Sequence, residues 1–67
     1  MFLVIDPDGV VVRVIVAEAE FDGIRLQHMI ERIRREIPRG LSQSTASALA
    51  GRKAQEILPR YKLVRLG

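Results

Sequence analysis

The chain of 67 residues contains no cysteine and no tryptophan, and it has a single histidine, His28. Without thiols it can form neither a disulfide framework nor a thiolate metal site. One histidine would need several carboxylates to complete a zinc site, and Asp6 and Asp8, two turn residues, supply too few oxygens for calcium. The five glycines are scattered, so no glycine-rich phosphate loop is present. We therefore expect no metal ion and no cofactor.

Aromatic residues are equally scarce, because the chain has only Phe2, Phe21 and Tyr61. Proteins that bind single-stranded nucleic acids stack bases on aromatic rings, and these three residues do not form such a platform. A general base needs an orienting partner and a pocket, and the sequence shows neither beside His28. We therefore expect a protein that is not an enzyme.

Long hydrophobic runs are also missing. The apolar start is interrupted at Asp6, and the longest apolar region, residues 10–17, contains Arg13 and is too short to span a membrane as a helix. Neither the basic start nor the unbroken apolar stretch of a secretory signal is present. The sequence therefore predicts a cytoplasmic protein with no membrane partner. Its hydrophobic content of 48% indicates a packed core rather than disorder, in a single compact domain covering residues 1–67.

The clearest structural signal is a β-hairpin at the N-terminus. Two β-rich runs flank the sequence Asp6-Pro7-Asp8-Gly9, in which Pro7 favours a type I turn and Gly9 the left-handed position after it. If Asp6 pairs with Val10, then Val4 faces Val12 and Phe2 faces Val14. One face of the hairpin would then hold the residues Phe2, Val4, Val10, Val12, Val14 and Val16.

The opposite face of this hairpin is predicted to be mostly apolar as well, since it would hold Leu3, Ile5, Val11, Arg13 and Ile15. A hairpin with one solvated face normally has polar residues there. We therefore expect this face to be covered by the C-terminal segment, a second copy of the chain or another protein, and we take these five residues as a candidate protein-binding site.

The rest of the chain predicts two helices and a last strand. Asp22 is a candidate cap for a helix over residues 23–37, which Pro38 ends, with a buried stripe of Leu26, Ile30, Ile33 and Ile37. A second helix would run from Ser42 or Ser44 to about Leu58, before a strand over residues 61–66. The expected fold is a small two-layer α+β domain of order β-β-α-α-β. Both helices would pack on one face of the sheet, and the last strand could lie beside either strand of the hairpin.

Residues 37–53, IPRGLSQSTASALAGRK, look like a helix-turn-helix motif that reads DNA. Two features oppose that interpretation. Pro38 lies where the first helix of the motif should still be running, and Arg52 and Lys53 lie far from the helix end that usually enters the groove. A capped, alanine-rich helix packed on the sheet explains the same residues.

A basic stripe is predicted on the first helix, because five residues recur at intervals of three and four: Arg25, His28, Arg32, Arg35 and Arg39. Together with Arg52 and Lys53, this stripe is a candidate site for an anion or a nucleic acid. A solvated helix face with weak ion pairs would show the same pattern.

The function that the sequence favours is a small, non-enzymatic protein-binding module that uses the apolar sheet face or a sheet edge. Cysteine-free single domains of this size are often regulators or inhibitors encoded by phages and mobile elements, such as anti-CRISPR proteins and polymerase inhibitors. Two alternatives stay open: a nucleic-acid-binding protein that uses the basic stripe, and a structural subunit of a larger assembly. The partner would be another protein or a second copy, with nucleic acid as a further candidate.

Overall fold

The computed structural model describes residues 1–67 and confirms the β-β-α-α-β order. The strands are β1 (Phe2–Ile5), β2 (Val11–Ile15) and β3 (Lys62–Arg65), and the helices are α1 (Phe21–Glu36) and α2 (Gln43–Ile57). Short 3₁₀ turns, η1 (Glu18–Glu20) and η2 (Leu58–Arg60), precede α1 and follow α2. The sheet is antiparallel, in the order β2-β1-β3, so β3 lies beside β1 and both β2 and β3 are edge strands.

The turn between β1 and β2 forms as its sequence predicts. Gly9 has a φ of 84°, in the left-handed region that favours glycine. One side-chain oxygen of Asp6 accepts hydrogen bonds from the backbone N–H groups of Asp8 and Val10, both at 2.9 Å. The Asp6 N–H donates to the Val10 carbonyl at 2.8 Å. The predicted pairing of Asp6 with Val10 is therefore confirmed.

The predicted register fails two residues further along, because β2 contains a β-bulge. Ile5 pairs with Val11, but Val4 pairs with Arg13 instead of Val12, so Val12 is the extra residue. Side chains alternate along a strand, and one inserted residue therefore moves every later side chain of β2 to the opposite face.

This shift corrects the predicted faces of the hairpin. Ile15, expected on the uncovered face, is 4% exposed in the core, and Arg13 moves to the same side of the sheet as Val4. Val14, expected inside, is 49% exposed on the outside, and Val16 is also exposed. Valine occupies both faces of this run, so the sequence pattern alone could not locate the bulge.

Both helices begin and end close to the predicted positions. Ser42 caps α2 by accepting a hydrogen bond from the Thr45 N–H at 3.2 Å. Asp22 does not cap α1, because the helix continues directly from η1 and already begins at Phe21. The helix ends at Glu36, just before Pro38, as expected.

The core is small, with only five of the 67 residues buried: Val4, Ile15, Met29, Ile33 and Tyr61. The helix residues and Tyr61 form one cluster, which is extended by partly buried side chains from α1, α2 and η2. Two members of the predicted buried stripe of α1 are exposed instead, since Leu26 and Ile30 are 46% and 41% accessible. The helices therefore do not bury all of their apolar surface.

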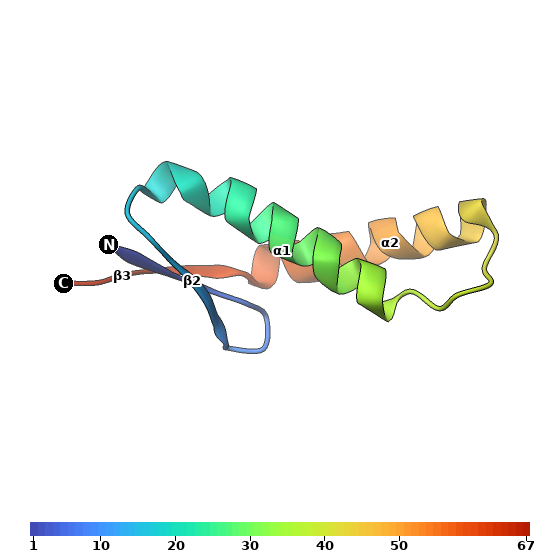
Figure 1. Ribbon diagram of the computed structural model, residues 1–67, viewed down its shortest axis with the longest axis horizontal. Helices are drawn as coiled ribbons and strands as arrows, with labels where there is room; N and C mark the ends of the chain where they lie inside the picture. Colours follow the sequence, from blue (N-terminus) through green and yellow to red (C-terminus); the bar gives the residue numbers. More distant parts are fainter.

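The molecule is elongated, with principal extents of 47 × 20 × 15 Å and a radius of gyration of 13.5 Å. A compact domain of 67 residues would have a radius of gyration of about 11 Å. Figure 1 shows the reason: the sheet and both termini lie at one end, and most of α2 extends beyond the strands. Neither helix is both long enough and apolar enough to cross a membrane.

Because of the bulge, we expect alanine substitutions at Ile15 and Val14 to lower the free energy of unfolding by different amounts. Ile15→Ala should lower the free energy of unfolding by about 2–4 kcal/mol, because it removes buried methyl groups beside Val4. Val14→Ala should change it by less than about 1 kcal/mol, because that side chain is half exposed. Urea denaturation measures both, and a larger loss for Val14→Ala than for Ile15→Ala would show that β2 lacks the bulge.

Candidate functional site

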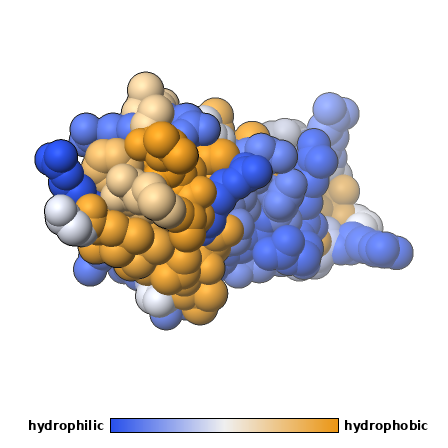
Figure 2. Space-filling model, turned by 60° about the vertical axis from the view of Figure 1, so that its left-hand side comes forward, coloured by the Kyte–Doolittle hydropathy of each residue, from blue (hydrophilic) through white to orange (hydrophobic).

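The outer face of the sheet is an exposed apolar surface. The strand registers place Leu3, Ile5, Val11, Val14 and Val64 on this outer face, opposite the side that carries Val4. Three of them are strongly exposed, with accessible fractions of 47% for Val11, 49% for Val14 and 40% for Val64. Figure 2 looks toward the sheet end of the molecule, where apolar side chains form one broad continuous area.

Every charged residue on the three strands is a cation: Arg13, Lys62 and Arg65. Lys62 shares the outer face, because it pairs with Ile5. Arg13 and Arg65 lie on the edge strands on the inner side, and both are exposed. The outer face is thus an apolar surface with one charged residue, the cation Lys62, at the start of β3.

Three of the five predicted binding residues, Leu3, Ile5 and Val11, do lie on the outer face. Arg13 and Ile15 do not, because both follow the bulge at Val12. In the structure the outer face instead contains Val14 of β2 and Val64 of β3, which both pair with Leu3. Alternation along residues 62–65 could have indicated Val64, but only after the register of β3 against β1 was known.

The basic stripe of α1 is partly neutralised within the chain, because Arg25 and Arg32 form ion pairs. Arg25 forms an ion pair with Asp22 at 2.9 Å, reaches the Leu58 carbonyl at 3.4 Å and lies over the Phe21 ring with its guanidinium carbon 5.0 Å from the centroid. The Arg25 guanidinium therefore already has partners within the chain for its charge and for its planar face.

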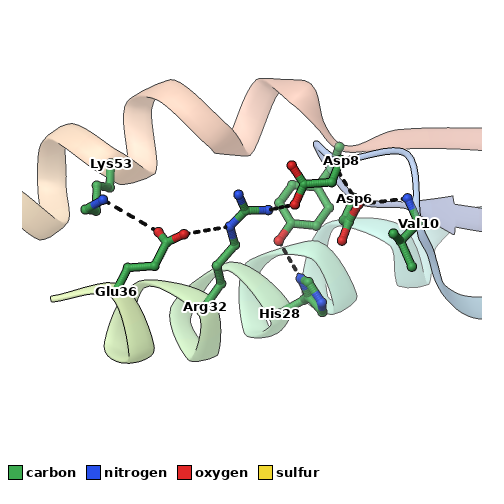
Figure 3. Close-up of polar contacts among 8 residues, drawn as sticks. Asp6, Asp8, Val10, His28, Arg32, Glu36 and Lys53 are labelled. Atoms are coloured by element: carbon green, nitrogen blue, oxygen red, sulfur yellow. Dashed lines mark hydrogen bonds and ion pairs between the residues drawn. The ribbon is translucent and has the colours of Figure 1, made fainter.

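Arg32 is the centre of a second polar network, drawn in Figure 3. Its guanidinium contacts Asp8 of the β-turn at 2.9 Å and Glu36 at 3.3 Å, and Glu36 also pairs with Lys53 of α2 at 3.6 Å. The network joins the β1–β2 turn to both helices. Arg32 therefore connects α1 to the β1–β2 turn, and Lys53 connects α2 to α1 through Glu36.

The remaining predicted anion-binding residues, Arg35, Arg39 and Arg52, make no ion pair and no side-chain hydrogen bond. Arg35 lines a polar cleft of about 280 Å³ together with Arg32 and His28, and acidic side chains also line this cleft: Asp6, Asp8 and Glu36. The structure therefore places the seven predicted basic residues in several different environments rather than on one free cationic surface.

His28 is not a free member of the stripe, because its Nδ1 shares a hydrogen bond with the Tyr61 hydroxyl. The two rings meet edge to face, with centroids 5.5 Å apart. Tyr61 is 4% exposed and belongs to the core cluster, so this contact ties α1 to the segment leading into β3. Sequence reasoning missed the partner because His28 and Tyr61 are 33 residues apart.

The chemistry of this contact is that of a structural hydrogen bond. Burial raises the pKa of the Tyr61 hydroxyl, while the nearby Arg32 opposes the shift. The raised pKa means that the Tyr61 hydroxyl keeps its proton to a higher pH than a free tyrosine and stays available for this contact.

No protein-family model, curated protein or solved structure matches this chain. Its function is therefore argued from its own surfaces.

The raised pKa of Tyr61 predicts that the protein loses stability in alkali. The unfolded chain releases this proton near the ordinary pKa of 10.0, whereas the folded chain still holds it. The free energy of unfolding should therefore fall as the pH rises from about 10 through the folded-state pKa. Urea denaturation across this range measures the loss, and the absorbance of the phenolate follows the single tyrosine directly.

The matched control is Tyr61→Phe, which should be less stable at neutral pH by about 1 kcal/mol because His28 loses its hydrogen-bond partner. This variant should lack the alkaline loss attributed to Tyr61. An equal alkaline loss in both proteins would contradict the assignment.

Proposed function

We propose that this protein is a non-enzymatic protein-binding module whose outer sheet face binds another protein by apolar contact. The observation that supports this most strongly is the exposure of Val11, Val14 and Val64 on one face of a sheet whose other face carries the buried Val4 and Ile15. Contiguous apolar surface of this kind is typical of sites for protein partners.

The charges on the strands favour a different protein over a second copy as the occupant. Two outer faces packed together would bury the Lys62 ammonium of each copy without an acidic residue from any strand to pair with it. Like charges placed across an interface weaken binding. The complementary partner has an apolar surface bordered by aspartate or glutamate.

Affinity in this proposal comes from the valine and leucine side chains, and the acidic border of the partner sets the orientation. Burial of each exposed valine contributes on the order of 1 kcal/mol. Screening of the border charges by salt therefore weakens binding only moderately. A nucleic-acid complex, in contrast, loses affinity steeply with salt because counterions are released from phosphates.

The test is site-specific photo-crosslinking in the cells that produce the protein. A photoreactive residue at Val14 or Val64 should crosslink to a polypeptide other than this chain, and the same residue at Arg52 on α2 should not. Val11→Glu, in the same protein, should abolish the crosslink because it buries a carboxylate against apolar surface.

Crosslinks from Val14 that contain only this chain would show that a second copy covers the sheet, which contradicts the proposal. Equal crosslinking from Val14 and Arg52, or an unchanged crosslink in Val11→Glu, would also contradict it.

A further inference from the structure

A second apolar surface lies away from the sheet, in the groove between α1 and α2. This groove has a volume of about 380 Å³ and is lined by Ile30, Ile33 and Ile37 from α1 and by Ala50, Gly51 and Ala54 from α2. Arg34 is the only charged residue that lines it. The groove is therefore an apolar site with a cation at its wall.

The α1 side of the groove has the length and the pattern of a helix-binding stripe. Leu26, Ile30, Ile33 and Ile37 recur at intervals of four and three residues and therefore lie on one side of the helix. Leu26 and Ile30 are 46% and 41% exposed, although they carry the spacing of a buried stripe. The stripe extends over about 16 Å, which is three turns of a helix.

The α2 side is shaped for close approach of another backbone. Ala50, Gly51 and Ala54 have short side chains, and a Cβ added at Gly51 would meet no atom within 4 Å. A ridge of side chains on a third helix fits a groove of this kind, with the apolar positions of that helix against the isoleucines of α1.

The groove opens on the side of the two helices that faces away from the Arg32 network. Ile30 precedes Arg32 by two residues, and Gly51 precedes Lys53 by two residues. Two residues turn a helix by about 200°, so each pair lies on nearly opposite sides of its helix. Figure 3 shows the ion pairs of Arg32 and Lys53 with Glu36 on the network side. The network therefore leaves the groove uncovered.

The charge around the groove is positive and is not balanced from within this segment. Residues 29–54, from the first lining residue to the last, contain six arginines and lysines but only two glutamates. Glu36 is paired with Arg32 and Lys53, and Glu31 lines the cleft between α1 and β2 instead. Arg34 is exposed and forms no ion pair, and so is Arg52, the residue after Gly51.

These charges select the chemistry of the occupant. A second copy of the chain would place its own Arg34 and Arg52 against the same cations, and like charges across an interface weaken binding. A partner with carboxylates beside an apolar stripe would instead pair with both arginines. The concave shape favours a helix over a lipid surface, because a ridge of side chains enters a groove whereas a planar bilayer meets only its rim.

We propose that the α1–α2 groove binds an amphipathic helix of a partner protein, about three turns long, with aspartate or glutamate on both sides of its apolar stripe. This is the mode in which an apolar helix face lies in a hydrophobic groove and is anchored at every third or fourth residue. The site is separate from the outer sheet face, and neither proposal rests on the other.

The test is a selection from helical peptides displayed on yeast. The peptides carry leucine at the spacing of the apolar stripe, and their flanking positions are randomised among aspartate, glutamate, lysine, arginine and glutamine. Sorting with the biotinylated protein, followed by sequencing, should enrich aspartate and glutamate at the flanking positions and deplete lysine and arginine.

Gly51→Leu should block the groove. The new side chain has room in the free protein and improves the helix propensity of α2, so the fold should be retained. It occupies the space of the bound helix and should weaken the binding of an enriched acidic peptide about tenfold or more. Circular dichroism checks that the variant keeps its helices.

Arg34→Glu tests the charge preference. It should weaken the acidic peptide about threefold to tenfold, and a selection with this variant should favour lysine and arginine at the flanking positions. Arg35→Glu is the matched control: it makes the same charge change at the next residue, which lines the polar cleft beside Asp8 and Arg32 instead. This control should keep both the affinity and the preference for acidic peptides.

Three outcomes would overturn the proposal. The first is a selection in which the wild-type protein enriches no peptide that Gly51→Leu fails to enrich. The second is equal enrichment of acidic and basic flanks, and the third is an equal effect of Arg34→Glu and Arg35→Glu, which would assign the preference to net charge rather than to the groove. Vesicles of phosphatidylglycerol serve as a further probe, and their binding without enrichment of any peptide would assign the surface to lipid.

The groove and the outer sheet face are read separately. Val11→Glu should leave the binding of the acidic peptide unchanged, and Gly51→Leu should leave the crosslink from Val14 unchanged. Loss of peptide binding with the crosslink intact, or the reverse, therefore shows which of the two proposals fails.

Discussion

The extra residue at Val12 determines which side chains of β2 enter the core, and most of the other features follow from it. With the bulge, Ile15 joins Val4 between the sheet and the helices, while Val14 turns outward. Without it, Val14 would be inside and Arg13 would lie among the apolar residues of the outer face. The same insertion therefore supplies the core with a larger side chain and keeps the centre of the outer face free of charge.

The small core explains why the surface is so apolar. Three short strands and two helices offer more apolar side chains than this chain can cover, and most of α2 extends beyond the sheet. The polar network of Asp8, Arg32, Glu36 and Lys53 and the contact between His28 and Tyr61 hold the layers together on one side of the helices. What is left uncovered are the outer sheet face and the α1–α2 groove, and burial of either surface by association would stabilise the fold.

The local features of the fold could be predicted from the sequence. The Asp-Pro-Asp-Gly turn, the cap at Ser42 and the helix end before Pro38 depend on residues close together in the chain. Features that depend on tertiary packing could not be predicted. The bulge lies in a run of valines that is apolar on both faces, the ion pair of Arg32 with Asp8 spans 24 residues, and the exposure of Leu26 depends on where α2 lies. Three of the five candidate sheet residues were identified because they lie on β1 or before the bulge.

The most direct test of this account is the solvent accessibility of individual methyl groups, measured by nuclear magnetic resonance with a soluble paramagnetic probe in the protein without its partner. The probe should strongly broaden the methyl signals of Val11, Val14 and Val64 and should leave those of Val4 and Ile15 sharp. A broadened Ile15 signal together with a protected Val14 signal would show that β2 has no bulge and that the outer face is not the surface described above.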